Sequence, residues 1–111
     1  IGLVEGVFRQ RLLICIIKET LEKRGVKLTR SGDDLYVGNK KLTVSIATKS
    51  ATSVLIHTGI NIISEGAPIA ACGLKNNLNI DDIEEFANEI LENYANEIDD
   101  IVMASTKVRG V

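Results

Sequence analysis

The sequence predicts an α+β fold in which an antiparallel or mixed sheet is flanked by helices. Two segments with apolar residues at helical spacing enclose a central segment of short alternating strands and turn residues. The chain has 111 residues, which suits one domain, and we expect residues 1–111 to form a single one. A composition of 45% hydrophobic and 25% charged residues excludes a disordered or low-complexity chain.

The first helix is expected over about residues 3–24. Its apolar face combines Leu3, Val7, Ile14, Ile17 and Leu21. The flanks of this face are apolar as well, and a helix that is apolar on most sides packs against more than one element. Gly25 is placed to end the helix, because glycine adopts the left-handed conformation that closes helix ends.

The central segment predicts three or four antiparallel strands. The turn residues 31–34 precede a strand over residues 35–37, and the Gly38-Asn39 pair predicts a tight hairpin to a strand over residues 41–48. After a turn at residues 49–51, the longest strand is expected over residues 53–63.

The second helix is expected after the irregular residues 64–79. Asn79 is its predicted N-cap, and the helix continues to about Ser105. The residues expected on its buried stripe are Ile83, Phe86, Ala87, Ile90, Tyr94, Ile98 and Ile101.

The two longest strands predict a sheet with unlike faces. Apolar residues occupy most even positions in both strands, and small or polar residues occupy most odd positions. If the hairpin pairs odd with odd positions, the apolar face meets the helices. The other face then carries Lys41, Thr43, Ser45, His57, Gly59 and Asn61. Such a face is either solvated or leaves room for a ligand or another packed layer, so Lys41 and His57 are either ordinary strand residues or site residues.

The stretch from Arg30 to Ala47 resembles the central motif of biotin- and lipoate-protein ligases. Asp34-Leu35 is similar to the Asp and aliphatic residue of the ligase turn, and Lys41-Leu42 to the Lys and aliphatic residue of the next hairpin strand. Residues 56–62, Ile-His-Thr-Gly-Ile-Asn-Ile, are similar to a later strand of those enzymes. Residues 32–37 and 41–48 look still more like an uncharacterised archaeal family related to this ligase and class II synthetase fold.

The resemblance implies a ligase-like domain that binds or transfers an activated small carboxylic acid. It gives Lys41 and Asp34 catalytic roles, and it assigns substrate binding to Thr43, Ser45, His57, Gly59 and Asn61. A small carboxylic acid or an acyl-adenylate is the implied partner, and ATP with Mg²⁺ is the cofactor pair to consider. The chain looks like the carboxy-terminal portion of such a domain, and since it begins with Ile1, we expect it to be incomplete at its amino terminus.

Several departures from the ligase pattern keep an alternative open. Asp33 stands where the ligases have Asn, Val44 stands where they have Gly, and no glycine- and arginine-rich loop occurs in the chain. The alternative is a non-catalytic binding or assembly domain that keeps the fold, with Asp33 and Asp34 as plain turn residues. A hydrolase or isomerase that uses His57 is the weakest hypothesis, because no Ser or Cys lies in a recognisable nucleophile motif.

Charge and composition exclude other classes of function. A net charge of -2 gives no basic surface for nucleic acid. The apolar run from Leu12 to Ile17 is far shorter than the roughly 20 residues that span a membrane. Cys15 and Cys72 form no CxxC motif and the chain has one His, so no metal site is predicted. Nothing favours a disulfide over a reducing cytoplasm, where we expect the protein. A homo-oligomer stays open.

Overall fold

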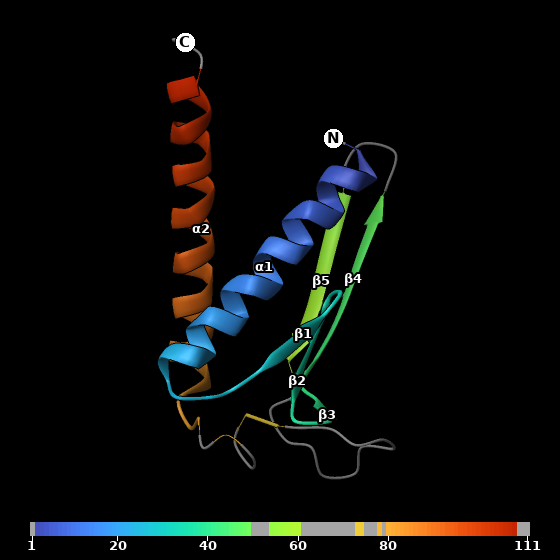
Figure 1. Cartoon of the computed structure of the whole chain (residues 1–111), viewed down its shortest axis with the longest axis vertical. Coiled ribbons are helices and arrows are strands. Elements are labelled where there is room, and N and C mark those ends of the chain that lie inside the picture. The colour runs from blue at the N-terminus through green and yellow to red at the C-terminus, as the bar shows by residue number, and fades with distance from the viewer. Residues whose placement is uncertain (1, 50–53, 61–72, 75–77, 79, 109–111) are drawn as a thin grey trace.

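A computed structural model describes residues 2–49, 54–60, 73–74, 78 and 80–108 (Figure 1). The elements are α1 (Leu3–Lys23), β1 (Thr29–Ser31), β2 (Asp34–Val37), β3 (Lys40–Lys41), β4 (Thr43–Lys49), β5 (Val54–Ile60) and α2 (Ile83–Val108). Strands β1, β2 and β3 form one antiparallel sheet, and β4 and β5 form a second. The predicted α+β class and the order of helix, antiparallel strands and helix are therefore confirmed.

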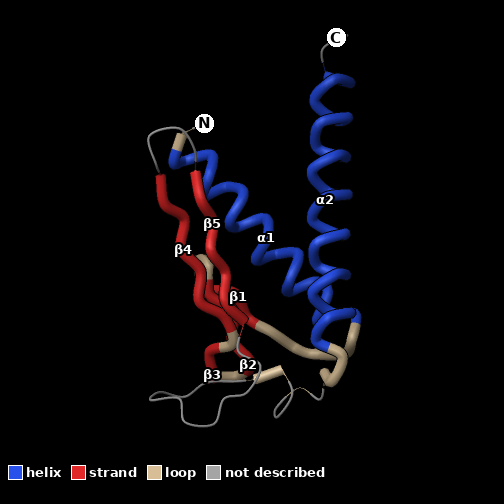
Figure 2. The backbone as a smooth tube through the Cα atoms, turned by 180° about the vertical axis from the view of Figure 1, so that it is seen from behind, coloured by secondary structure: helices blue, strands red, loops and turns tan. Residues whose placement is uncertain are grey.

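Helix α1 lies between the β4–β5 hairpin and α2 (Figures 1 and 2). The two helices meet near the carboxyl end of α1 and diverge toward the amino end of α1 and the carboxyl end of α2. The core lies where α1, the first half of α2 and the strands converge. Its buried residues are Ile14, Ile17, Leu21, Leu35, Leu42, Leu74, Ile80, Phe86 and Ile90. Among the described residues, neither helix is long and apolar enough to cross a bilayer.

Helix α1 ends as the sequence predicts, at a glycine in the left-handed region. Gly25 has φ of 87°, and its N–H donates to the Glu22 carbonyl at 3.0 Å. The N–H of Val26 donates to the Leu21 carbonyl at 3.1 Å. This pair of bonds is a Schellman motif, which satisfies carbonyls at the helix end and directs the chain toward β1.

Substituting Gly25 with Ala tests this end of the helix. No atom lies within 4 Å of a Cβ built at Gly25, so the cost comes from the positive φ alone. We expect the free energy of unfolding to fall by about 1–2 kcal/mol. Gly2→Ala is the matched control, because its φ is -83° and its Cβ would also meet nothing, so a change of no more than about 0.5 kcal/mol is expected there. Equal losses in urea denaturation would contradict the assignment.

Helix α2 begins later than predicted. Its first residue is Ile83, and the Asp82 carboxylate caps it by accepting the Glu85 N–H at 2.9 Å. The predicted N-cap, Asn79, lies outside the described residues. Of the predicted stripe only Phe86 and Ile90 are buried, at 1% and 6% exposed, and Ala87 between them is exposed. Ile101 is 46% exposed because α2 extends beyond its contact with α1.

The strand predicted over residues 41–48 is divided at Leu42, where the chain passes from the first sheet to the second. The Leu42 N–H donates to the Leu35 carbonyl at 2.9 Å. The Leu35 N–H donates to the Thr43 hydroxyl at 3.1 Å. A side-chain oxygen thus takes the place of a strand carbonyl at the junction, and Leu35, Leu42 and Thr43 are all fully buried there.

The predicted pairing of odd with odd positions is wrong. In the β4–β5 hairpin Thr43 pairs with Ile60 and Ser45 with Thr58, so odd positions of β4 lie opposite even positions of β5. The physical reason is the length of the connection: residues 50–53 separate paired Lys49 and Val54, and an even number of connecting residues reverses the parity. Thr43 and Ser45 therefore do not share a face with His57 and Gly59.

Candidate functional site

The structure brings Lys41 and Asp34 together. Lys41, on β3, pairs with Tyr36 of β2, and Asp34 lies two residues before Tyr36 on the same face of that strand. The Lys41 Nζ lies 3.1 Å from the Asp34 Oδ1. The two side chains are 28% and 27% exposed, so the pair is half-buried and open to solvent on one side.

Two tight turns set this geometry. Gly32 has φ of 62° and, with Asp33, joins paired Ser31 and Asp34. Gly38 also has φ of 62° and, with Asn39, joins paired Val37 and Lys40. Two-residue turns with positive φ match the twist of antiparallel strands, which fixes the register of both hairpins. Consequently the β2–β3 register, rather than a flexible loop, holds Lys41 beside Asp34.

The hydrogen bond from Lys41 to Asp34 raises the pKa of Lys41 above its usual value of 10.5. Burial acts in the opposite direction, and the charge of Asp34 adds to the rise. Lys41 is therefore a positioned cation at neutral pH. A positioned ammonium group can bind the carboxylate of an acid or the phosphate oxygens of a nucleotide.

The other predicted site residues are divided between places in the fold. Thr43 is fully buried and its hydroxyl accepts the Leu35 N–H. Ser45 is 8% exposed and lies under α1. His57 and Gly59 occupy the alternate positions of β5, on the opposite face of the hairpin. Asn61 lies outside the described residues. The predicted single polar surface is thus replaced by a half-buried Lys41–Asp34 pair and two internal hydroxyls.

The Ser45 hydroxyl belongs to a hydrogen-bonded chain that sequence reasoning missed, which we call the Gln10 network (Gln10, Asp33, Ser45 and Thr58). The Gln10 Nε2, on α1, donates to the Asp33 Oδ2 at 3.1 Å and to the Ser45 Oγ at 2.9 Å. The Ser45 Oγ is 2.8 Å from the Thr58 Oγ1. Gln10 is only 3% exposed. The sequence held one signal of this network: Gln10 is a polar residue between Val7 and Ile14 on the apolar face of α1.

The Gln10 network connects the Asp33-Asp34 turn with an apolar groove between α1, β5 and α2. This groove has a volume of about 320 Å³. Its lining includes Leu13, Ile17, Thr58, Ile60, Phe86 and Ile90. Thr58 is the one polar side chain among its described lining residues. The groove is thus an apolar surface with one hydroxyl, that of Thr58. Hydrogen bonds through Ser45 and Gln10 link this hydroxyl to Asp33, the residue before Asp34.

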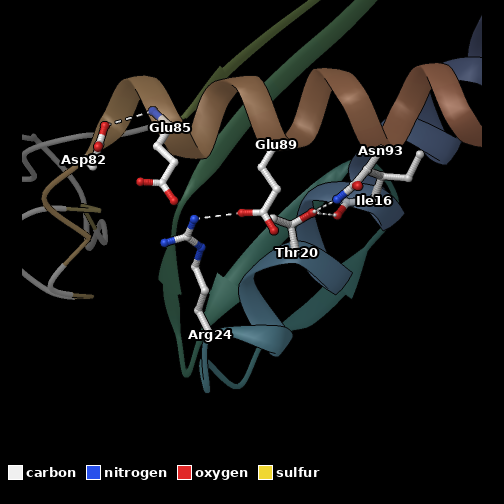
Figure 3. A network of polar contacts seen from close by, with 7 residues as sticks. All are labelled: Ile16, Thr20, Arg24, Asp82, Glu85, Glu89 and Asn93. Carbon is white, nitrogen blue, oxygen red and sulfur yellow. Dashed lines mark hydrogen bonds and ion pairs between the residues drawn. The ribbon is translucent and has the colours of Figure 1, made fainter.

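Contacts between the two helices fix their crossing (Figure 3). The Arg24 Nη2 lies 2.7 Å from the Glu89 Oε1, and the Arg24 guanidinium lies 5.4 Å from the centre of the Phe86 ring. The Asn93 Nδ2 donates to the Thr20 Oγ1 at 3.3 Å, and that hydroxyl donates to the Ile16 carbonyl at 2.7 Å. These contacts have a structural role, because they hold α2 against the end of α1.

Acidic residues gather near the start of α2, where Glu84, Glu85 and Glu89 border a shallow surface hollow. In the part of the chain that the structure describes, no group of three or more His, Cys, Asp or Glu side chains is arranged to hold a metal ion. Cys15 is a half-buried free thiol, and Cys72 lies outside the described residues.

Comparison with known proteins places the chain in a family. Residues 2–109 match the family described as a domain of unknown function, DUF366. An uncharacterized protein of Methanocaldococcus jannaschii is 51% identical over 94 residues, which cover 84% of this chain and 42% of that protein. A solved structure, described as a protein of unknown function from Pyrococcus horikoshi, is 35% identical in sequence and superposes with a TM-score of 0.83. The superposed region is 94% of this chain and 55% of the Pyrococcus chain. The chain thus spans about half the length of these relatives. On these matches, the chain belongs to the DUF366 family of uncharacterised archaeal proteins.

Proposed function

We propose that this domain binds a small carboxylic acid, or its activated acyl form, at Lys41. The observation that carries the proposal is the half-buried Lys41–Asp34 pair, in which two turns hold a cation at a fixed place on the sheet. The resemblance to biotin- and lipoate-protein ligases supports acyl or adenylyl transfer as the reaction. It also supports a role for this chain as the carboxy-terminal portion of a longer ligase-like domain. We infer a cytoplasmic location from the cysteine usage, which does not favour a disulfide.

Lys41 would contribute electrostatic stabilisation to such a reaction. A charge-assisted hydrogen bond from its ammonium group to a carboxylate or phosphate oxygen is worth about 1.5–3 kcal/mol. Asp34 already accepts one hydrogen bond from Lys41, so an incoming anion would share the ammonium group with Asp34. Asp34 would therefore orient Lys41 and weaken its attraction for small anions, which favours ligands that also bury an acyl chain.

An acyl chain would add binding energy where the protein removes it from water. Burial of hydrocarbon contributes about 25 cal/mol for each Å² removed from water, so a chain of several methylenes adds several kcal/mol. The apolar groove of about 320 Å³ does not provide this contact, because Lys41 and Asp34 lie on the face of the β2–β3 hairpin opposite buried Leu35, which packs in the core that lines the groove.

The described residues do not fit the Mg²⁺ that the resemblance suggests. One oxygen of Asp33 accepts from Gln10, one oxygen of Asp34 binds Lys41, and no third acidic ligand joins them among the residues described. We therefore assign no step to a metal ion.

A second candidate is a non-catalytic binding or assembly domain that keeps the ligase-like fold. The observation that favours it is the use of the Thr43 and Ser45 hydroxyls in internal hydrogen bonds, which leaves them no role under a substrate. The Ser45 hydroxyl would then serve to join α1 to β4, and the Thr43 hydroxyl to join β4 to β2.

Binding measurements with Lys41→Met test the proposal. The probes are octanoate, lipoate and biotin, titrated into the isotope-labelled chain and followed by amide chemical shifts. We expect at least one probe to bind and Lys41→Met to weaken its affinity by about tenfold or more, because one charge-assisted hydrogen bond is lost. ATP–pyrophosphate exchange with the same acids, on a full-length member of the family, then separates an adenylating enzyme from a binding domain.

Lys40→Met is the matched control. Lys40 is the preceding residue of β3, is exposed and pairs with Val37 rather than Tyr36. It should leave affinity within about twofold. Both variants should keep the wild-type melting temperature to within a few degrees, because an exposed lysine and a solvent-accessible ion pair each contribute little to stability. Equal effects of the two substitutions, or ligand binding retained in a destabilised Lys41 variant, would refute the role of Lys41.

A further inference from the structure

We propose that the Tyr36 side chain forms the apolar wall of the Lys41 site, and that the acid bound there carries a planar ring next to its carboxylate. This inference rests on the proposed function of Lys41 and adds to it the class of ligand. It gives Tyr36 a part in ligand choice that neither the sequence nor the resemblance assigns to it.

Strand pairing places Tyr36 directly beside Lys41. Tyr36 lies on β2, the central strand of its sheet, and is the paired residue of Lys41 on β3. Paired residues of antiparallel strands point to the same face, with Cβ atoms about 4.5–5.5 Å apart. Asp34 lies two residues earlier on that face, and its Oδ1 is 3.1 Å from the Lys41 Nζ. A ligand that lies against Tyr36 can therefore reach the ammonium group.

The electrostatics of Lys41 agree with this placement. The hydrogen bond to Asp34 is the largest cause of the raised pKa of Lys41, and burial opposes it. Tyr36 contributes a further, smaller rise in the pKa of Lys41, as a nearby phenol group would. The phenol group and the ammonium group thus belong to one site.

The rest of this face carries short polar side chains. Thr29 and Ser31 of β1 pair with Tyr36 and Asp34, and both are exposed. Tyr36 is half-buried, and it is the only Phe or Tyr of the chain in a described strand. The face therefore offers a ligand one aromatic ring, with the Lys41 ammonium on the β3 side and hydroxyl groups on the β1 side.

These neighbours favour a planar ring over a flexible chain in the ligand. Two aromatic rings attract each other by offset stacking or edge-to-face contact, in addition to the surface that they remove from water. A flexible chain gains only the burial, and it loses conformational freedom when the protein orders it. Past Tyr36, such a chain would extend over the exposed Thr29, where the sheet offers little apolar surface.

Binding of benzoate and cyclohexanecarboxylate, followed by amide chemical shifts, tests the inference. The two acids have the same carbon skeleton, but only benzoate has a planar aromatic ring. We expect the wild-type chain to bind benzoate about threefold or more tightly than cyclohexanecarboxylate, because only the aromatic ring can stack on Tyr36. Nuclear Overhauser effects between the protons of benzoate and those of the Tyr36 ring should locate the contact.

Two substitutions separate the ring of Tyr36 from its size and its place in the strand. Tyr36→Ile keeps an apolar side chain with high strand propensity, so the fold should persist while the preference for benzoate disappears. Tyr36→Phe keeps the ring and should keep the preference. The matched control is Tyr94→Ile, which changes a half-buried tyrosine of α2, away from the sheet, and should leave the ratio of affinities unchanged.

The outcomes distinguish this inference from the proposed function. Equal affinity for the two acids, or a preference that survives Tyr36→Ile, would overturn the role of Tyr36; weaker binding in Lys41→Met would still support the Lys41 site. Benzoate binding that depends on Tyr36 but not on Lys41 would overturn the proposed function, and with it the assignment of Tyr36 to that site. Failure of every acid to bind would overturn both.

Discussion

Replacing Leu21 with Ala is expected to lower the free energy of unfolding by about 3–4 kcal/mol. Leu21 is fully buried in the core between α1, α2 and the strands, and its carbonyl accepts the Val26 N–H in the Schellman motif. The substitution removes apolar contacts and leaves a cavity, and these two losses add. Helix propensity does not contribute to the loss, because Ala is the better helix former. Urea denaturation followed by far-ultraviolet circular dichroism measures the change.

Leu91→Ala provides the matched comparison for Leu21→Ala. It is the same substitution within a helix, but Leu91 is 64% exposed. The expected change is within about 0.5 kcal/mol of zero. Where Leu21→Ala leaves too little folded protein, Ile17→Val at a 2% exposed position should still show a loss of about 1 kcal/mol. Comparable losses at Leu21 and Leu91 would mean that the core is not where the structure places it.

Changing Gln10 is expected to give the second large effect. Gln10→Leu removes both hydrogen bonds of the amide and leaves Asp33 and Ser45 each without one partner, which should cost about 1–3 kcal/mol. Gln10→Glu should cost more, because it places a second carboxylate within about 3 Å of Asp33 and removes the donor. Both are measured as changes in the urea midpoint at constant slope.

A double substitution separates charge repulsion from loss of shape at this position. Combining Gln10→Glu with Asp33→Asn reverses the direction of the hydrogen bond, because the Asn amide can donate to the Glu carboxylate. The double variant should regain more than half of the stability that Gln10→Glu loses. If Asp33→Asn instead adds to the loss, Gln10 and Asp33 are not coupled in solution.

The helices and tight turns could be predicted because local sequence determines them. Apolar spacing and Gly25 are sufficient to define α1, since helical periodicity and a left-handed end residue are properties of neighbouring positions. The turn at Gly38-Asn39 is specified in the same way. The start of α2 was misplaced because Asp81 and Asp82 are as suitable for capping as Asn79.

The pairing of β4 with β5 could not be derived from alternation alone. Both strands alternate, but which residues of β4 and β5 share a face depends on the number of residues in the connection. The sequence alone does not show that the last pair of the hairpin is Lys49 with Val54. One residue more or less in that turn exchanges the faces of an entire strand. The same error concealed the Gln10 network, because Ser45 and Thr58 were expected on different faces.

The Lys41–Asp34 pair was predictable in part. The resemblance identified both residues, and the turn at Gly38 fixes the register that brings them together. The predicted companions of Lys41 were not recoverable, because Thr43 and Ser45 lie beyond the junction at Leu42 in a different sheet. Periodicity does not reveal such a junction, since Lys41 to Lys49 reads as one alternating strand.

The junction at Leu42 also has a consequence for the order of folding. All described strand pairings join consecutive strands, so each sheet forms from a short stretch of chain at a low entropic cost of loop closure. The bonds from Gln10 to Asp33 and Ser45 span 23 and 35 residues, and the contact between Arg24 and Glu89 spans 65. We therefore expect the hairpins to form before the helices dock, and the docking of α1 to align the two sheets in one tertiary structure.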